Sequence, residues 1–366
     1  MRVVRGRHHH VRAGWVPPAL PSVGVAAALL VSLASPDAQS DSFVSNLLRR
    51  EEFSAADIRA VDRGDAVVKP LDTDVRQELA YFGVVHVDAP ADRFVERFAD
   101  IEKFERGPGV PQIGRFGVPP RLDDLASMTL PSKDVTALER CRPGDCDVRL
   151  PTATMTRLQN QVNWSSQNAA SQANEITREM LFDLLHAYEV DGNAALDLID
   201  DGGKPLPVAE QLRALLTNSG HLPLLVPELV TYLDEYPRSR PPGVAEFFYW
   251  SVVDFGLRPT VRINHVISYS LEARPSGVSH VIAIKQLYAS HYFQTALELR
   301  FLVDDLRRPD RRGFYLFSVT RSRIDGTSGF SGALLRPVIS RRSRNAVRSY
   351  LEHLKRQLET VDPPPF

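Results

Sequence analysis

Five segments between residues 245 and 325 share one pattern, in which polar and apolar side chains alternate and turn-forming residues separate the segments. Alternation with a period of two is typical of strands, and short turns join antiparallel neighbours. This part of the chain predicts an antiparallel β meander, and it limits the fold more than any other feature. The expected strands are 245–256, 258–273, 279–290, 292–305 and 313–325.

The last segment predicts a long amphipathic helix. Its apolar residues follow helical spacing and predict one buried stripe. The opposite side is basic, and we expect it either to be solvated or to make transient contact with anionic membrane head groups. The stripe comprises Leu335, Val338, Ile339, Val347, Tyr350, Leu351, Leu354 and Leu358, and the basic side Arg341, Arg342, Arg344, Arg348, Lys355 and Arg356.

A second β-rich region lies near the start of the chain. Two strands are expected within 65–71 and 76–89, and the second is broken at Pro90. An amphipathic helix follows, because Phe94, Phe98 and Ile101 recur at helical spacing. The segment therefore predicts a strand, a tight corner and a helix.

Residues 107–242 have a different character. A Pro/Gly-rich connector is followed by helical patterns at 152–164, 170–192, 207–220 and 225–237. We expect a mostly helical insertion, acting as a lid, between the two β-rich parts. The domain organisation predicted is then 41–106 for the N-terminal helix, first strands and first helix, 107–242 for the insertion, and 243–366 for the remaining strands and last helix.

This order of elements resembles the START/polyketide-cyclase-like (SRPBCC, helix-grip) superfamily. The resemblance is carried by "VVHVDAPADRFVERFADIEKF" at 84–104, and by the last strand and helix at 313–360. It implies an α+β fold in which an antiparallel helix-grip sheet wraps around a long C-terminal helix. It also implies a cavity between sheet and helix that holds a hydrophobic small molecule such as a lipid, sterol or polyketide.

The first forty residues have the regions of a secretory signal peptide. A basic start precedes an apolar run at 23–34, which is too short to span a bilayer, and small residues at 38 and 40 fit a cleavage site. The alternative is an uncleaved N-terminal anchor. We expect an exported protein, periplasmic or secreted.

Charge and cysteine content narrow the classes of function. The chain carries a net charge of −1, and removal of residues 1–40, which hold four arginines and one aspartate, leaves −4. A nucleic-acid partner is not expected, because it would need a concentrated basic face.

Cys141 and Cys146 flank a Pro-Gly turn and predict a local disulfide in an exported protein. Without a nearby His they predict no metal site.

Candidate ligand-binding residues come from the strand alternation. His265 and Tyr269 share the predicted inward face of one strand with apolar neighbours. Gln286 and Tyr288 share the predicted inward face of the next, with Lys285 on the opposite face. We expect these four residues and Trp250 to line the cavity and orient a polar head; the alternative is that they are core residues satisfied by neighbours.

Three functions are compatible with these patterns. The first is binding or carriage of a hydrophobic molecule. The second is a cyclase or hydrolase with His265 or His291 as general base, and the third is a scaffold whose helical insertion docks a protein. No acidic residue is predicted to orient either histidine, and no dinucleotide or phosphate-loop motif occurs, so binding without a cofactor is favoured over catalysis.

Overall fold

The computed structural model describes residues 36–107, 109–198, 200–201, 204–220, 222–271, 277–305, 313–325 and 329–360. Most of the predicted signal segment, residues 1–35, lies outside the described residues. The predicted cleavage position after Ser40 falls within the first described helix, α1 (Pro36–Arg50).

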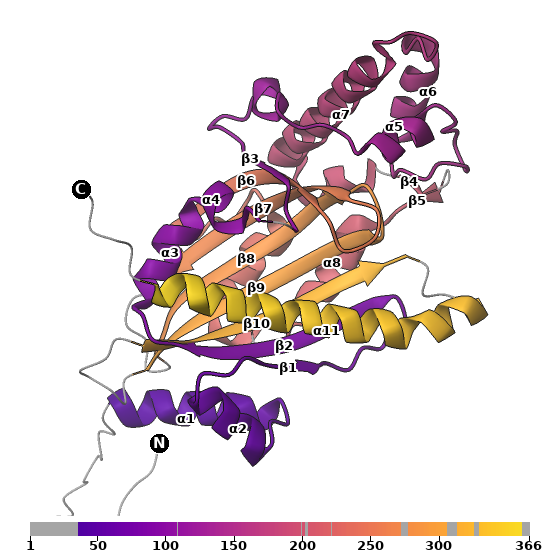
Figure 1. Ribbon diagram of the computed structural model, residues 1–366. Helices are drawn as coiled ribbons and strands as arrows, with labels where there is room; N and C mark the ends of the chain where they lie inside the picture. The colour runs from indigo at the N-terminus through magenta and orange to yellow at the C-terminus, as the bar shows by residue number, and fades with distance from the viewer. Residues whose placement is uncertain are drawn as a thin grey trace, which may run out of the picture. The chain divides into compact units, whose positions relative to one another are not determined.

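The fold is α+β and is built on one eight-stranded antiparallel sheet (Figure 1). Its strand order is β1-β2-β10-β9-β8-β7-β6-β3. Strands β6 to β10 form the predicted meander. Strand β2 pairs with β10, and this pairing joins the two β-rich parts of the sequence. The strands are β1 (Val67–Pro70), β2 (Glu78–Val87), β3 (Gln112–Arg115), β6 (Val244–Val253), β7 (Thr260–Ser270), β8 (Val278–Ala289), β9 (Phe293–Asp305) and β10 (Gly313–Ile324).

Strand β3 was not expected. It lies in the Pro/Gly-rich connector and pairs with β6, so the segment predicted to be a helical insertion also supplies one edge of the sheet. Gly114 lies against the ring of Trp250, where a Cβ atom would come within 2.6 Å of the indole. The strand approaches closely because residue 114 has no side chain.

The strand-to-helix corner at Pro90 is present as predicted. Pro90 is the N-cap of α3 (Ala91–Ala99), and Phe94 and Phe98 are buried. The expected helix is interrupted at Asp100, whose side chain accepts a hydrogen bond from the Lys103 backbone and starts α4 (Ile101–Glu105). The short break keeps Phe104 in the same aromatic group, with its ring centroid 5.5 Å from that of Phe98.

The long C-terminal helix is α11 (Gly329–Glu359), and it lies along one face of the sheet together with α3 and α4 (Figure 1). Leu351 packs directly on Gly83, where a Cβ atom would lie 2.7 Å from its Cδ1. The apolar stripe is confirmed for Ile339, Val347 and the residues that follow. It is wrong for Val338, which is 51% exposed. Arg336 and Ser340 contact β2, so this part of α11 lies against the sheet, and Val338 is on the outer side of the helix.

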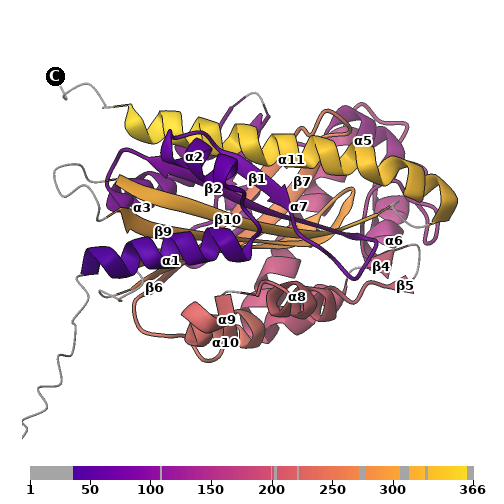
Figure 2. The ribbon, with the colours of Figure 1, turned by 90° about the horizontal axis from the view of Figure 1, so that it is seen from below.

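The helices of the 107–242 segment cover the opposite face of the sheet. Figure 2 shows α8 and α10 on one side of the sheet and α11 on the other. These helices therefore lie on the other side of the sheet from α11. The helices of this segment are α5 (Ser132–Leu138), α6 (Thr152–Gln161), α7 (Ala169–Asp191), α8 (Val208–Thr217), α9 (Leu222–Leu225) and α10 (Pro227–Glu235). The segment also contains 3₁₀ turns at Leu122–Leu125 and Gly192–Leu198 and the two-residue strands β4 (Asp200–Asp201) and β5 (Lys204–Pro205). Helices α1 and α2 (Ala55–Asp62) lie nearby.

Candidate functional site

A cleft of about 390 Å³ lies between the sheet and α11. Helix α11 packs chiefly on β2 and β1, and α3 packs on β9. The volume is within the range of about 300–1,000 Å³ found for small-molecule sites. The lining residues are Glu105, Gly109, Val110, Ile113, Tyr249, Ser251, Val253, Asp254, Arg262, Ile284, Glu298, Arg300, Thr320, Ala346, Val347 and Tyr350.

The walls of the cleft are largely apolar. Val110 and Ile113 come from the β3 side, Ile284 from the centre of the sheet, and Val347 from α11. Such walls favour an apolar ligand body, because burial of apolar surface drives binding.

The floor carries a buried charged network. Arg300, 2% exposed, donates from Nε to Glu298 Oε1 at 2.8 Å and from Nη2 to the hydroxyl of Tyr350 at 2.7 Å. The Tyr350 hydroxyl donates in turn to Glu105, and the Arg300 guanidinium lies 4.9 Å from the ring centroid of Phe98. Burial raises the pKa of Glu105. The network fixes Arg300 at the base of the cleft.

Two nitrogen donors of cleft-lining side chains, Nε of Arg262 and Nη1 of Arg300, are buried and have no hydrogen-bond partner among the described residues. Nδ2 of Asn264 and Nε2 of Gln286, on the same face of the sheet but outside the lining of the cleft, are also buried without a described partner. An unpaired buried polar group costs about 1–3 kcal/mol. The unpaired nitrogens of Arg262 and Arg300 are therefore the feature of the cleft that most needs a functional explanation.

His265 belongs to a different cluster, on the opposite face of the sheet. Its Nδ1 lies 3.0 Å from the hydroxyl of Tyr188, and its Nε2 lies 3.2 Å from Glu246 Oε2. Tyr232 also donates to Glu246, at 2.7 Å. Burial lowers the pKa of His265 to about 4, so the imidazole is neutral at pH 7.

Lys285 shares this face with His265. The two residues pair directly across β7 and β8, and directly paired residues point to the same face. The Lys285 Nζ donates to Asn193 Oδ1 at 2.7 Å and to the Leu233 carbonyl at 3.0 Å. Burial lowers the pKa of Lys285 to about 7.

The predicted grouping of His265 with Gln286 is wrong. A register shift beside Ile263 makes Tyr288 pair with Ile263 and Gln286 pair with Asn264. The extra residue moves Tyr288 to the His265 face, whereas Gln286 stays with Ile282 and Ile284 on the α11 face and Lys285 shares the His265 face.

The other candidate residues have partners on the helical side. The hydroxyl of Tyr269 donates to Glu228 at 3.0 Å, and that of Tyr288 to the Arg149 carbonyl at 2.6 Å. The Trp250 indole donates to the Asp124 carbonyl at 2.8 Å. None of the three lines the cleft beside α11.

Both candidate catalytic histidines have an acidic neighbour, contrary to expectation. His291 Nε2 lies 3.0 Å from Oδ2 of the buried Asp134, and Arg258 lies 3.3 Å from the same carboxylate. Asp134 comes from α5, far from His291 in the sequence, so no local sequence pattern predicted this contact. Neither His265 nor His291 lines the cleft.

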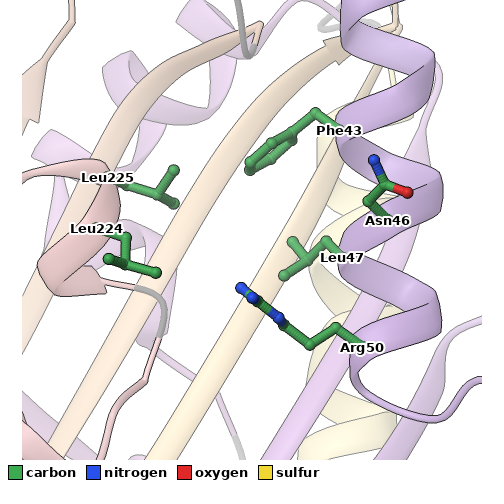
Figure 3. A pocket seen from close by; sticks show the side chains of 6 residues that line it. All are labelled: Phe43, Asn46, Leu47, Arg50, Leu224 and Leu225. Carbon is green, nitrogen blue, oxygen red and sulfur yellow. The ribbon is translucent and has the colours of Figure 1, made fainter.

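A second groove, of about 460 Å³, lies between α1 and α9 (Figure 3). Phe43 and Leu47 line one side, and Leu224 and Leu225 the other. Leu224 is 72% exposed. The groove offers apolar contacts without the buried polar groups that would orient a ligand.

The predicted disulfide between Cys141 and Cys146 is confirmed. Within the described ranges, no group of three or more His, Cys, Asp or Glu side chains is arranged to hold a metal ion. Nor does any helix of the described part of the chain combine the length and apolar composition needed to cross a membrane.

The cleft residues Arg262, Glu298 and Arg300 were missed by the sequence reasoning. Their strands alternate as predicted, but the polar side was assigned to solvent. The buried Val266, on the same face as Arg262, was the available signal that this side is also covered.

Comparisons with protein-family models, with characterised proteins and with solved structures found no match to this chain.

Proposed function

We propose that this protein binds an amphipathic small molecule in the cleft between the sheet and α11. The observation that carries the proposal is the cleft itself, a space of about 390 Å³ with apolar walls and a buried polar floor. Apolar walls with a few fixed polar groups are typical of small-molecule sites. A lipid, sterol or polyketide-like molecule has the matching chemistry.

A helix-grip architecture is part of this proposal. It is supported by the order of β2, α3, the meander and α11, and by the position of the cleft beside the long helix. A helical layer on the opposite face is the main departure from that plan. Fold alone does not fix function, so the proposal rests on the cleft.

Binding without catalysis is the form of the proposal that the contacts favour. The two candidate bases, His265 and His291, are each held by an acid and lie away from the cleft.

An export route also belongs to the proposal, supported by the Cys141–Cys146 disulfide, since disulfides persist in oxidising compartments.

The test is native mass spectrometry, with extraction of bound lipids, on protein isolated from its source organism. The matched variants are Ala346→Trp, at an exposed cleft-lining position of α11, and Val338→Trp, at an exposed position outside the cleft. We expect a bound small molecule in the wild type and in Val338→Trp, and loss of most of it in Ala346→Trp. Equal ligand content in both variants, or no ligand in the wild type together with no binding of added amphiphiles, would contradict the proposal.

A further inference from the structure

The outer side of α11 carries a concentration of positive charge. The helix holds seven cationic side chains and two carboxylates, which gives +5, whereas the whole chain has a net charge of −1. No aspartate or glutamate occurs between Asp325 and Glu352. We use the term basic face for four exposed arginines of this helix, Arg341, Arg342, Arg344 and Arg348.

The charges of the basic face are not neutralised by described neighbours. Arg348 donates from Nε to the carbonyl oxygen of Ala66 at 3.1 Å, and this bond leaves its charge unpaired. The other three arginines form neither a hydrogen bond nor an ion pair with any described residue. Glu352 follows Arg348 by about one turn, but Arg356 follows Glu352 at the same spacing and balances it.

The carboxylates of the strands beside α11 are matched by other cations. Glu78 of β2 is buried between Arg321 and Arg323, at 2.5 and 3.0 Å. Asp72, after the end of β1, lines a shared hollow with Arg336, so these two charges offset each other. The basic face therefore keeps four positive charges for a partner.

The spacing of these arginines is unfavourable for an isolated surface. Arg341 and Arg344 are three residues apart, and Arg344 and Arg348 are four apart, so like charges are neighbours on the helix. Such pairs destabilise a helix, and a solvated surface usually mixes both signs. A partner that supplies negative charge removes the repulsion.

The shape of this surface fits an extended partner. Figures 1 and 2 show α11 at the surface, with no other described element over its outer side. The basic face and the exposed Val338 extend along about 15 Å of helix, which is more than one small anion can contact. The helix is packed on the sheet, so it cannot enter a nucleic-acid groove, and residues 336–348 contain no aromatic side chain on which bases could stack.

From these observations we infer that the basic face of α11 docks the protein on an anionic membrane surface. The apolar stripe of α11 is buried against the sheet, so the helix lies on the lipid head groups and does not insert. Ala346, on the same helix, is exposed and lines the cleft, so docking brings the edge of the cleft near the lipids. The inference goes beyond the proposed function and does not rest on it.

The experiment is co-sedimentation of the full chain with lipid vesicles. The vesicles contain phosphatidylcholine alone or with about one third phosphatidylglycerol, which is anionic. We expect binding to the anionic vesicles only. The affinity should fall by about tenfold when NaCl is raised from about 0.05 to 0.3 M, because salt screens exposed charges.

Two triple variants of equal net charge locate the contact. The first removes three charges of the basic face through Arg341→Gln, Arg342→Gln and Arg344→Gln. The control removes three exposed charges of the 107–242 segment through Lys133→Gln, Arg140→Gln and Arg238→Gln. Each arginine near an anionic surface is worth about fivefold in affinity, so the first variant should bind about a hundredfold more weakly and the control within about threefold of the wild type.

Thermal unfolding separates docking from folding. The first variant should be at least as stable as the wild type, because it removes like-charge repulsion. Both variants keep the basic N-terminal segment, so that segment cannot cause a difference between them.

Three outcomes would overturn the inference: equal vesicle binding by the two variants, equal binding of the wild type to both kinds of vesicle, or tighter binding of the wild type to an oligonucleotide than to anionic vesicles. Absence of a bound small molecule in native mass spectra would contradict the proposed function and leave the docking inference in place.

Discussion

The two faces of the β sheet both bury ionisable side chains, but the hydrogen bonding of these side chains differs between the faces. On the helical side, Lys285 and His265 each contact polar partners supplied by α7, α10 or the turn after α7. On the α11 side, Arg262, Asn264 and Gln286 keep donors without described partners. Around His265 and Lys285 the helical face is closed by the chain's own hydrogen bonds, although Nε of Arg149 lacks a described partner elsewhere on that side, whereas the α11 face stays incomplete beside a cleft.

This difference indicates separate roles for polar residues of the same strands. A fully satisfied buried network stabilises one arrangement of sheet and helices. A partly satisfied one lowers stability, and it is retained where binding needs preorganised groups. On β7, His265 thus serves packing, whereas Arg262 lines the cleft of the proposed binding site.

The largest effect is expected from Asn193→Leu, on the closed face. Asn193 accepts from Lys285 and donates to the Leu233 carbonyl at 3.1 Å. Leucine leaves Lys285 short of an acceptor, so the free energy of unfolding at pH 7 should fall by about 2–3 kcal/mol. Urea unfolding measures this, with Asn345→Leu on the exposed side of α11 as control. Equal stability of the two variants would refute the idea that the closed face depends on this contact.

For each pH unit a smaller effect is expected through Lys285, although it accumulates over several units. Burial lowers its pKa from 10.5 to about 7 in the folded state. Between these values the unfolded chain holds a proton that the folded protein has released, so stability from this group rises with pH, by up to about 1.4 kcal/mol per unit. Below about pH 7 Lys285 is protonated in both the folded and the unfolded state, so its contribution to stability stays constant and is least favourable there.

The Lys285→Met variant should lack this rise. Unfolding is measured at intervals from about pH 7 to 10 for the wild type, for Lys285→Met and for Lys133→Met, an exposed control. Parallel curves for the wild type and Lys285→Met would show that Lys285 does not titrate in this window.

The smallest effect, and one of opposite sign, is expected from Gln286→Met on the open face. Its Nε2 has no described partner, so an apolar side chain of similar shape removes an unpaired donor. The protein should gain about 0.5–1 kcal/mol of stability, measured by urea unfolding. A clear loss of stability would mean that Gln286 is a structural residue like Asn193.

The sequence predicted the strands, the Pro90 corner and the long last helix, because alternation and helical spacing are local signals. It could not predict which layer would cover each side of the sheet. Alternation shows which residues share a face, but His265 and Arg262 each needed tertiary structure to identify their neighbours. The register shift beside Ile263 was hidden as well, since the sequence at 279–288 alternates without interruption. One extra residue there moved Tyr288 to the opposite face from Gln286.

The two ends of the sheet have a consequence for how copies of this protein meet. The edge strands β1 and β3 are four residues long, whereas the strands between them have ten or more. Strand β1 ends at Pro70, which has no backbone donor. A strand from another molecule would find only a short ladder at either edge, and short or proline-bearing edges resist edge-to-edge association. The unexpected strand β3 thus also helps to keep a large, apolar sheet from assembling into aggregates.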